Sequence, residues 1–172
     1  MTISMYKASV PIFLQFLTSL STLLDKAAAF AEAKKVDPSV LLNTRLAPDM
    51  FPLIRQVRAA TDHAINSCGR LAGADLPTFS NAETTISELK GRIAKTIDFL
   101  KSLKPSQIDG TEDKEIKFIT PAGATREFTG ASLLLNNSLP NFYFHVTTAY
   151  DILRHCGVEL GKRDFMGTPV KL

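Results

Sequence analysis

The amino-acid sequence predicts an all-α fold, a four-helix bundle with a short β-hairpin inserted before the last helix. Apolar residues recur at the three- and four-residue spacing of amphipathic helices over four long stretches of the chain. Only between about residues 114 and 128 does this spacing give way to the alternation that is typical of strands. The 172 residues contain no internal repeat and no long linker, so we expect a single domain over residues 1–172.

The first helix is expected over about residues 4–34 and the second over about residues 50–72. Pro11 interrupts the first helix, which therefore either begins near Ser9, with Pro11 in its first turn, or is kinked at Pro11. Asp49 stands directly before the second helix, where a carboxylate can accept hydrogen bonds from the free backbone N–H groups. Asp49 is therefore predicted to be the N-cap of the second helix.

The third helix, expected over about residues 82–103, has the clearest apolar stripe. Ser80 and Glu83 match the S-x-x-E capping box that marks a helix N-terminus. A Pro-Ala-Gly turn at residues 121–123 joins the two predicted strands, and the hairpin must pack against the helices because an isolated hairpin is only marginally stable. The last helix is expected over about residues 130–156.

Composition and charge argue against several classes of protein. Lys+Arg 20 against Asp+Glu 17 leaves a net charge of +3 that is spread along the chain, whereas a nucleic-acid binder gathers its basic residues in a stripe or arm. No apolar run approaches the roughly 20 residues that a membrane-spanning helix needs. Cys68 and Cys156 have no CxxC partner and are expected to be reduced. We therefore expect a cytoplasmic protein that binds neither nucleic acid nor a membrane.

Polar residues follow one flank of the last helix and one face of the second. Asn141 and His145 are four residues apart beside the apolar stripe of the last helix, and Asp49, Gln56 and His63 repeat every seven residues in the second. Zinc prefers imidazole, thiolate and carboxylate ligands, so the two amides are poor candidates for metal ligands. A histidine on such a flank is more often a hydrogen-bonded residue at the edge of the core than a metal ligand.

Motifs of the common catalytic sites are missing from the sequence. It contains no HExxH, no G-x-S-x-G, no P-loop and no G-x-G-x-x-G between a strand and a helix. Acidic residues are scattered, and no pair of carboxylates stands out. The sequence therefore identifies no catalytic residue, and the polar flank of the last helix is the strongest candidate site.

Four segments together carry a resemblance that covers nearly the whole chain: "MYKASVPIFLQFLTSLSTLLDKAAAFAEAKKVD", "LLNTRLAPDMFPLIRQV", "TPAGATREFTG" and "LPNFYFHVTTAYDILRHCGVELGKRDF". They resemble an uncharacterised bacterial family, a domain of unknown function of about this length, within the DinB/YfiT-like superfamily of four-helix bundles. The link to the wider superfamily rests on the order of the elements and on the pattern "H…ILRHCGVE". The resemblance implies a DinB-like four-helix bundle.

Members of that superfamily typically hold a divalent metal with three histidines, one on the second helix and two, four residues apart, on the last. By this resemblance, His145 matches the second histidine of the last-helix pair, and Asn141 stands where the first would be. Gln56 stands at the corresponding position of the second helix. One of the three ligands is thus retained, so His145 is the one candidate metal ligand and we expect no cofactor.

We expect the superfamily pocket to persist without its metal, lined by Asp49, Gln56, Asn141, Tyr143 and His145. Such a pocket would bind a small polar ligand or hold a buried hydrogen-bond network with a structural role. The resemblance also implies a homodimer. The aromatic residues supply more surface than one core needs and offer part of an interface, namely Tyr6, Phe13, Phe16, Phe142, Tyr143 and Phe144.

Two alternatives remain open. In the first, the chain is a divalent-metal-dependent thiol transferase or hydrolase, with zinc or nickel as cofactor. Asp49 or His63 then replaces the missing ligands around His145. In the second, the chain is a partner-binding stress-response scaffold, which predicts no deep polar pocket.

Overall fold

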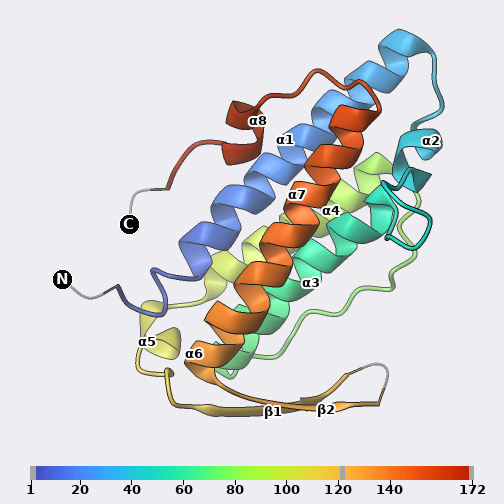
Figure 1. Cartoon of the computed structure of the whole chain (residues 1–172). Coiled ribbons are helices and arrows are strands. Elements are labelled where there is room, and N and C mark those ends of the chain that lie inside the picture. The colour runs from blue at the N-terminus through green and yellow to red at the C-terminus, as the bar shows by residue number, and fades with distance from the viewer. Residues whose placement is uncertain (1–2, 121–122, 171–172) are drawn as a thin grey trace.

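The computed structural model describes residues 3–120 and 123–170 (Figure 1). Four long helices form its body: α1 (Val10–Lys34), α3 (Leu53–Ala72), α4 (Ile86–Ser102) and α7 (Leu139–His155). Helices α1 and α3 each pack against both α4 and α7, so the four enclose one common core. A hairpin precedes the last helix, so this arrangement confirms the predicted helical bundle with a hairpin before its last helix.

Shorter elements close the ends and one side of the bundle. They are α2 (Pro38–Asn43), α5 (Pro105–Ile108), α6 (Gly130–Ser132) and α8 (Lys162–Met166). Helix α8 lies along α1, where the Ser19 hydroxyl donates to the Phe165 carbonyl at 2.7 Å and Lys26 pairs with Asp164 at 2.7 Å. The chain after α7 therefore returns along the first helix (Figure 1).

Aromatic residues of α1 and α7 form much of the core. Phe13 and Phe142 are fully buried and meet edge to face, with ring centroids 4.8 Å apart. Phe16 packs in the same way on Tyr143, with centroids 5.1 Å apart, whereas Phe144 is 55% exposed. The core thus uses most of the aromatic surface that the sequence offered for an interface. In the described part of the chain, no helix combines the length and the apolar character that crossing a membrane requires.

Helices α1 and α3 both begin later than the sequence predicted. Helix α1 begins at Val10 and not near residue 4, which agrees with the alternative that placed its start near Ser9. Pro11 lies in its first turn, where its missing N–H needs no acceptor. Helix α3 begins at Leu53, because Pro52 has an extended backbone (ψ 164) and accepts the first helical hydrogen bond from Gln56 N at 3.0 Å. The predicted cap Asp49 is therefore wrong, since it is exposed in the preceding turn.

Helix α4 begins at Ile86, and its capping box is formed by Thr85 and Glu88 instead of Ser80 and Glu83. Glu88 N donates to Thr85 Oγ1 at 3.2 Å, and Thr85 N donates to Glu88 Oε2 at 3.0 Å. Both pairs match the sequence pattern, but Glu83 lies in the α3–α4 loop and pairs with two arginines. The helix therefore starts at the second match.

The hairpin consists of β1 (Glu115–Ile119) and β2 (Thr125–Thr129), paired antiparallel with Ile116 opposite Phe128. Alternate residues share a face, so Ile116, Phe118, Arg126 and Phe128 lie on the same side of the hairpin. Ile116 is buried and both phenylalanines are half-buried, which places this side against the bundle. The hairpin lies across one end of the bundle (Figure 1). Residues 121 and 122 of the predicted turn lie outside the described residues.

The last helix is not continuous over residues 130–156 as predicted. Between α6 and α7 the chain forms a wider π-helical segment, η1 (Leu133–Ser138), in which Leu139 N donates to Leu134 O, five residues back. Pro140 explains the interruption, because proline has no N–H to donate to the carbonyl four residues before it and its ring clashes with that carbonyl. The widened turn removes this conflict before α7 begins.

Candidate functional site

Two of the predicted pocket residues meet between α3 and α7. Gln56 Oε1 lies 2.7 Å from His145 Nδ1, and Gln56 Nε2 donates to the Phe51 carbonyl at 2.9 Å. Because a carbonyl oxygen can only accept, His145 donates its proton from Nδ1, and its Nε2 carries the lone pair. Gln56 and His145 are both buried, at 1% and 9% exposed.

The His145 ring stacks with two neighbouring rings. Its centroid lies 5.5 Å from that of His63, with 20° between the planes, and 6.3 Å from that of Phe51, with 9° between the planes. Burial and, to a smaller extent, the nearby His145 together lower the pKa of His63 to about 4. Burial also lowers the pKa of His145. Both imidazoles are therefore neutral at pH 7.

A pocket of about 520 Å³ lies between the hairpin, α3 and the start of α7, and we call it the hairpin pocket. Three segments supply its walls, and α3 is distant in sequence from the other two. They are represented by His63, Asn66 and Arg70 from α3, by Phe118, Arg126 and Phe128 from the hairpin, and by Leu133, Asn137 and Asn141 from η1 and α7. This volume is within the range of about 300–1,000 Å³ that small-molecule sites occupy.

The π-helical segment faces this pocket. Leu133, Asn137 and Ser138 all belong to η1 and line the cavity. Without a widened turn, the side chains of η1 and α7 would follow one continuous helical spiral. The π-helical turn changes that spiral at the pocket wall, a placement that is frequent at functional sites.

Asn141 is the one predicted pocket residue that lines the hairpin pocket. Its amide Nδ2 donates to the Asn137 carbonyl at 2.7 Å, one turn earlier in the chain. Gln56 and His145 therefore bond to each other, while the amide of Asn141 is directed to the backbone of η1. His63 connects the two groups, since it stacks on His145 and also lines the hairpin pocket.

The other two predicted pocket residues lie elsewhere. Asp49 is exposed in the turn before α3. Tyr143 is half-buried against Phe16 and Phe142, and burial raises the pKa of its hydroxyl. Neither residue borders the hairpin pocket.

Of the residues that line the hairpin pocket, the sequence singled out His63 only as a possible metal ligand, and it missed Asn66, Arg70, Phe118 and Arg126. His63, Asn66 and Arg70 are spaced by three and four residues, which places them on one face of α3. That spacing was the available signal. Arg126 and Phe118 carry no comparable signal, because their place in the pocket depends on how the hairpin packs against the bundle.

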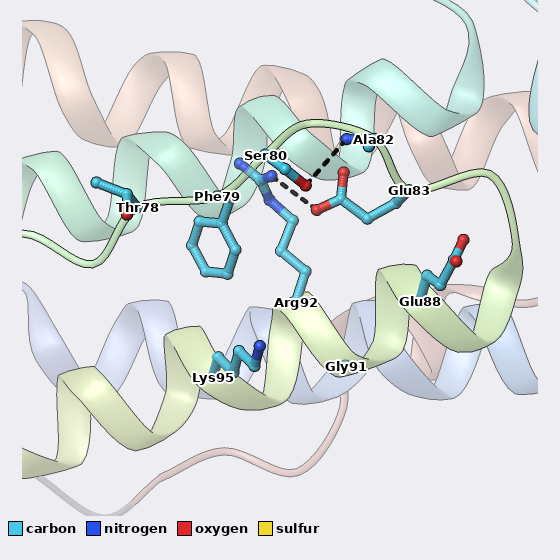
Figure 2. Close-up of a pocket in the computed structure, with 9 residues that line it drawn as sticks. All are labelled: Thr78, Phe79, Ser80, Ala82, Glu83, Glu88, Gly91, Arg92 and Lys95. Atoms are coloured by element: carbon cyan, nitrogen blue, oxygen red, sulfur yellow. Dashed lines mark hydrogen bonds and ion pairs between the residues drawn. The ribbon is translucent and has the colours of Figure 1, made fainter.

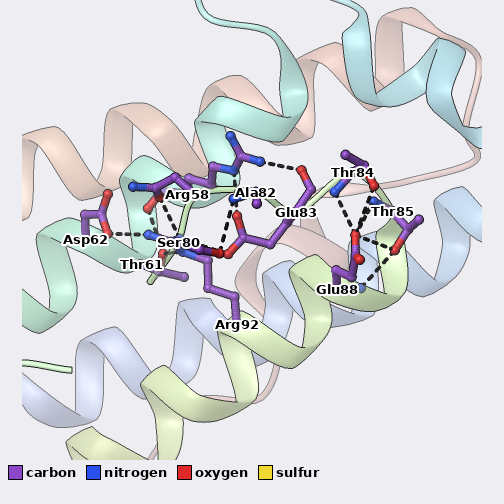
Figure 3. A network of polar contacts seen from close by, with 11 residues as sticks. Arg58, Thr61, Asp62, Ser80, Ala82, Glu83, Thr84, Thr85, Glu88 and Arg92 are labelled. Atoms are coloured by element: carbon purple, nitrogen blue, oxygen red, sulfur yellow. Dashed lines mark hydrogen bonds and ion pairs between the residues drawn. The ribbon is translucent and has the colours of Figure 1, made fainter. Parts of the chain in front are cut away.

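A second polar cluster surrounds Arg92 of α4, which is 2% exposed. Its Nε donates to Thr61 Oγ1 at 2.7 Å, its Nη1 to Asn81 Oδ1 at 2.8 Å and to Glu83 Oε1 at 3.0 Å, and its Nη2 to Asp62 Oδ1. Figure 3 shows Arg92 within this network, which links α3, α4 and the loop between them. Each nitrogen of this guanidinium thus has an acceptor from the protein.

The Arg92 cluster borders a smaller pocket of about 400 Å³ (Figure 2). In that pocket the Arg92 guanidinium lies over the Phe79 ring, 4.2 Å from its centroid. Glu83 also pairs with Arg58, whose Nε lies 2.9 Å from Glu83 Oε2. Because its charged groups already pair with one another, this cluster holds the α3–α4 loop in place and has a structural role.

The resemblance implies a metal site of three histidines, one on the second helix and two on the last. Within residues 3–120 and 123–170, no group of three or more His, Cys, Asp or Glu side chains could hold a metal ion. His63 and His145 supply two imidazoles, while Gln56 and Asn141 are amides whose Nε2 and Nδ2 donate to backbone carbonyls. The residues present therefore do not complete a three-ligand site.

Comparisons with known proteins agree with this architecture. Residues 5–166 match a family described as a domain of unknown function, DUF1993. The chain is also similar to the crystal structure of a DinB family member protein from Shewanella denitrificans, with 42% sequence identity and a TM-score of 0.86. That similarity covers 97% of this chain and 94% of the other. Among the curated proteins, none matches the chain.

Proposed function

We propose a function from the premise that the chain belongs to the DUF1993 family of DinB-like proteins: it binds a small polar molecule in the hairpin pocket. The observation that carries this proposal is the convergence of polar side chains from α3, the hairpin and η1–α7 on one cavity of about 520 Å³. Binding sites combine mostly apolar walls with a few placed polar groups, and this cavity has both. Phe118, Phe128 and Leu133 supply apolar wall, and the polar groups come from α3, the hairpin and η1–α7.

The π-helical turn supports the same site by an independent argument. A π-helical segment is rare and interrupts regular helical packing, and here three of its residues line the cavity. A purely structural bundle has no need of a pocket at this position. The pocket thus favours ligand binding over a scaffold whose function depends only on its outer surface.

Blocking the cavity tests the proposal. The substitution Asn141→Phe places a ring in the hairpin pocket, whereas Asn136→Phe makes the same chemical change at an exposed position of η1. Binding of a mixture of neutral, anionic and cationic fragments is followed by ¹H–¹⁵N NMR. We expect fragments to shift resonances of pocket residues in the parent chain and in Asn136→Phe, but not in Asn141→Phe.

The fold of each variant is checked by circular dichroism, so that a loss of binding is separated from unfolding. If no fragment of any charge shifts the pocket resonances of the folded parent chain, the proposal fails. A stoichiometric metal that is lost in His145→Ala would instead favour the metal-dependent thiol transferase or hydrolase.

A further inference from the structure

Arg70, in the last turn of α3, has unsatisfied hydrogen-bonding capacity in the hairpin pocket. Its Nη2 donates to Asn66 Oδ1 at a long 3.2 Å, and its guanidinium lies over the Phe118 ring, 4.0 Å from the centroid. The Nε of Arg70 is buried and has no hydrogen-bond acceptor among the residues that the structure describes. A buried guanidinium donor without an acceptor is costly, because its lost hydration is not replaced.

Arg92, which has a structural role, has more hydrogen-bond partners within the chain than Arg70 has. All three nitrogens of Arg92 donate to oxygens of Thr61, Asn81, Glu83 or Asp62. Arg70 has one weak partner and an aromatic ring. The Arg70 guanidinium thus borders the hairpin pocket with one side-chain hydrogen bond to the described chain, so it can donate to an acceptor that enters the pocket.

The charges that line the hairpin pocket favour an anion as that acceptor. Two guanidinium groups, those of Arg70 and Arg126, border the cavity, and Asp62 is the one acidic residue among its described lining residues. Asp62 is already paired with Arg92. Since Asp62 is paired and His63 is neutral at pH 7, the two guanidinium groups give this wall its positive charge.

The remaining wall indicates the rest of the ligand. The Phe118 and Phe128 rings lie 6.0 Å apart with 18° between their planes, and both face the cavity beside Leu133. These surfaces suit a flat apolar body but offer it no hydrogen bonds. An inorganic ion alone would leave Phe128 and Leu133 uncovered, whereas an organic anion would cover them.

From these observations we infer that the ligand of the hairpin pocket is a small organic oxyanion, a carboxylate or a phosphate monoester. Arg70 receives its anionic group, and Arg126 adds charge from the hairpin. The apolar body lies against Phe118 and Phe128. This inference rests on the proposed function, because it specifies the chemistry of the molecule that the same pocket binds. An arginine fork can hold two oxygens of either anion at once.

Four probes of similar shape and different charge test the inference. Benzoate and phenyl phosphate carry the anionic groups, whereas benzamide is neutral and benzylammonium is cationic. Each is titrated into the ¹⁵N-labelled chain, with the backbone amides of the pocket and the side-chain Nε–H of Arg70 as reporters. We expect one or both anions to bind more tightly than benzamide and benzylammonium and to shift the Arg70 Nε–H signal. The anion that binds more tightly shows whether the pocket prefers a carboxylate or a phosphate monoester.

Substitution of Arg70 is the second part of the test. Arg70→Gln is expected to weaken binding of the anionic probe about tenfold or more, since it removes charge-assisted hydrogen bonds. Arg154→Gln, at an exposed position near the end of α7, is the matched control and should leave the affinity unchanged. Arg70→Lys keeps the charge without the fork and should give an intermediate affinity.

The outcomes separate this inference from the proposed function. If benzamide or benzylammonium binds in the pocket as tightly as the anions, the pocket is a binding site but the inference is overturned. Equal affinity of the tighter-binding anion for the parent chain and for Arg70→Gln overturns it as well. If no probe shifts a pocket resonance in the folded chain, both the inference and the proposed function are contradicted.

Discussion

Gln56 and His145 form a buried side-chain pair that joins α3 to α7, with 2.7 Å between Gln56 Oε1 and His145 Nδ1. The Gln56 amide is held in turn by the Phe51 carbonyl, which fixes its oxygen toward the imidazole. This chain of hydrogen bonds places the proton of the neutral His145 ring on Nδ1, and burial lowers the pKa of His145. The Gln56 amide oxygen accepts this N–H but does not stabilise a positive charge as a carboxylate would.

Gln56→Glu should raise the pKa of His145. A carboxylate at 2.7 Å from the ring nitrogen favours the imidazolium, so we expect a rise of about one pH unit or more relative to the parent chain. The measurement is an NMR titration of the His145 Cε1–H signal. Gln15→Glu makes the same change on α1, where Gln15 donates to the Met166 carbonyl, and should leave that titration unchanged. An unaltered His145 pKa in Gln56→Glu contradicts the pairing.

Stability should fall as the pH falls from about 6.5 to 4, in part because of His63. The unfolded chain takes up a proton at His63 near the ordinary pKa of 6.5, whereas the folded chain does so only near a pKa of about 4. Between these values the unfolded state binds more protons, so acid lowers the free energy of unfolding. The loss at this one group is at most about 3 kcal/mol.

The pH effect is measured by urea denaturation at several pH values between 4 and 7. His63→Phe should make the decline shallower, because the ring that resists protonation is gone. His155→Phe, at an exposed position at the end of α7, is the matched control and should keep the slope of the parent chain. A His63→Phe chain with the parental slope would show that burial of this imidazole does not affect acid stability.

The sequence predicted the helices and the hairpin because their signals are local. The stripe of apolar residues in residues 82–103 and the alternation after residue 114 are visible in short windows. The helix boundaries were less predictable where two local signals competed. Thr85–Glu88 and Ser80–Glu83 both match a capping box, and only the pairing of Glu83 with Arg58 and Arg92 decides between them.

The candidate site was predictable only in part, for a different physical reason. The spacing of Gln56 and His145 placed each on a face where another helix packs, and the two residues do meet. The hairpin pocket depends instead on the interruption before Pro140 and on the packing of the hairpin across the end of the bundle. Both are tertiary features, so no spacing within the sequence identified Arg126 as a residue of the same pocket as Arg70.

Replacement of Arg92 should destabilise the fold and release the α3–α4 loop. Arg92→Met leaves Asp62 without its partner and removes one of the two arginines that pair with Glu83. We expect a loss of about 2–3 kcal/mol in the free energy of unfolding, below the value for a fully buried pair because Asp62 is half exposed. Urea denaturation measures this loss, and limited proteolysis between residues 73 and 85 reports on the loop.

Lys95→Met is the matched control for Arg92, one turn further along α4 at an exposed position. It removes a basic side chain from the rim of the same pocket without breaking an ion pair that the structure describes. Its stability and its proteolysis should match those of the parent chain. If Arg92→Met is as stable as Lys95→Met, the cluster does not hold the loop.

Zinc should stabilise a variant that restores a third imidazole but not the parent chain. Asn141 is one helical turn before His145, and His63 stacks on His145 from α3. Asn141→His therefore brings three imidazoles close together, which suits zinc, whereas the parent chain has two and an amide. At zinc concentrations of about 100 times the Kd, the expected gain is about 2.7 kcal/mol, measured as a rise in Tm. The rise should disappear when His145→Ala is added to Asn141→His. The opposite result is stoichiometric zinc or nickel in untagged parent protein that is lost in His145→Ala. This result would overturn the expectation that the parent chain holds no metal cofactor.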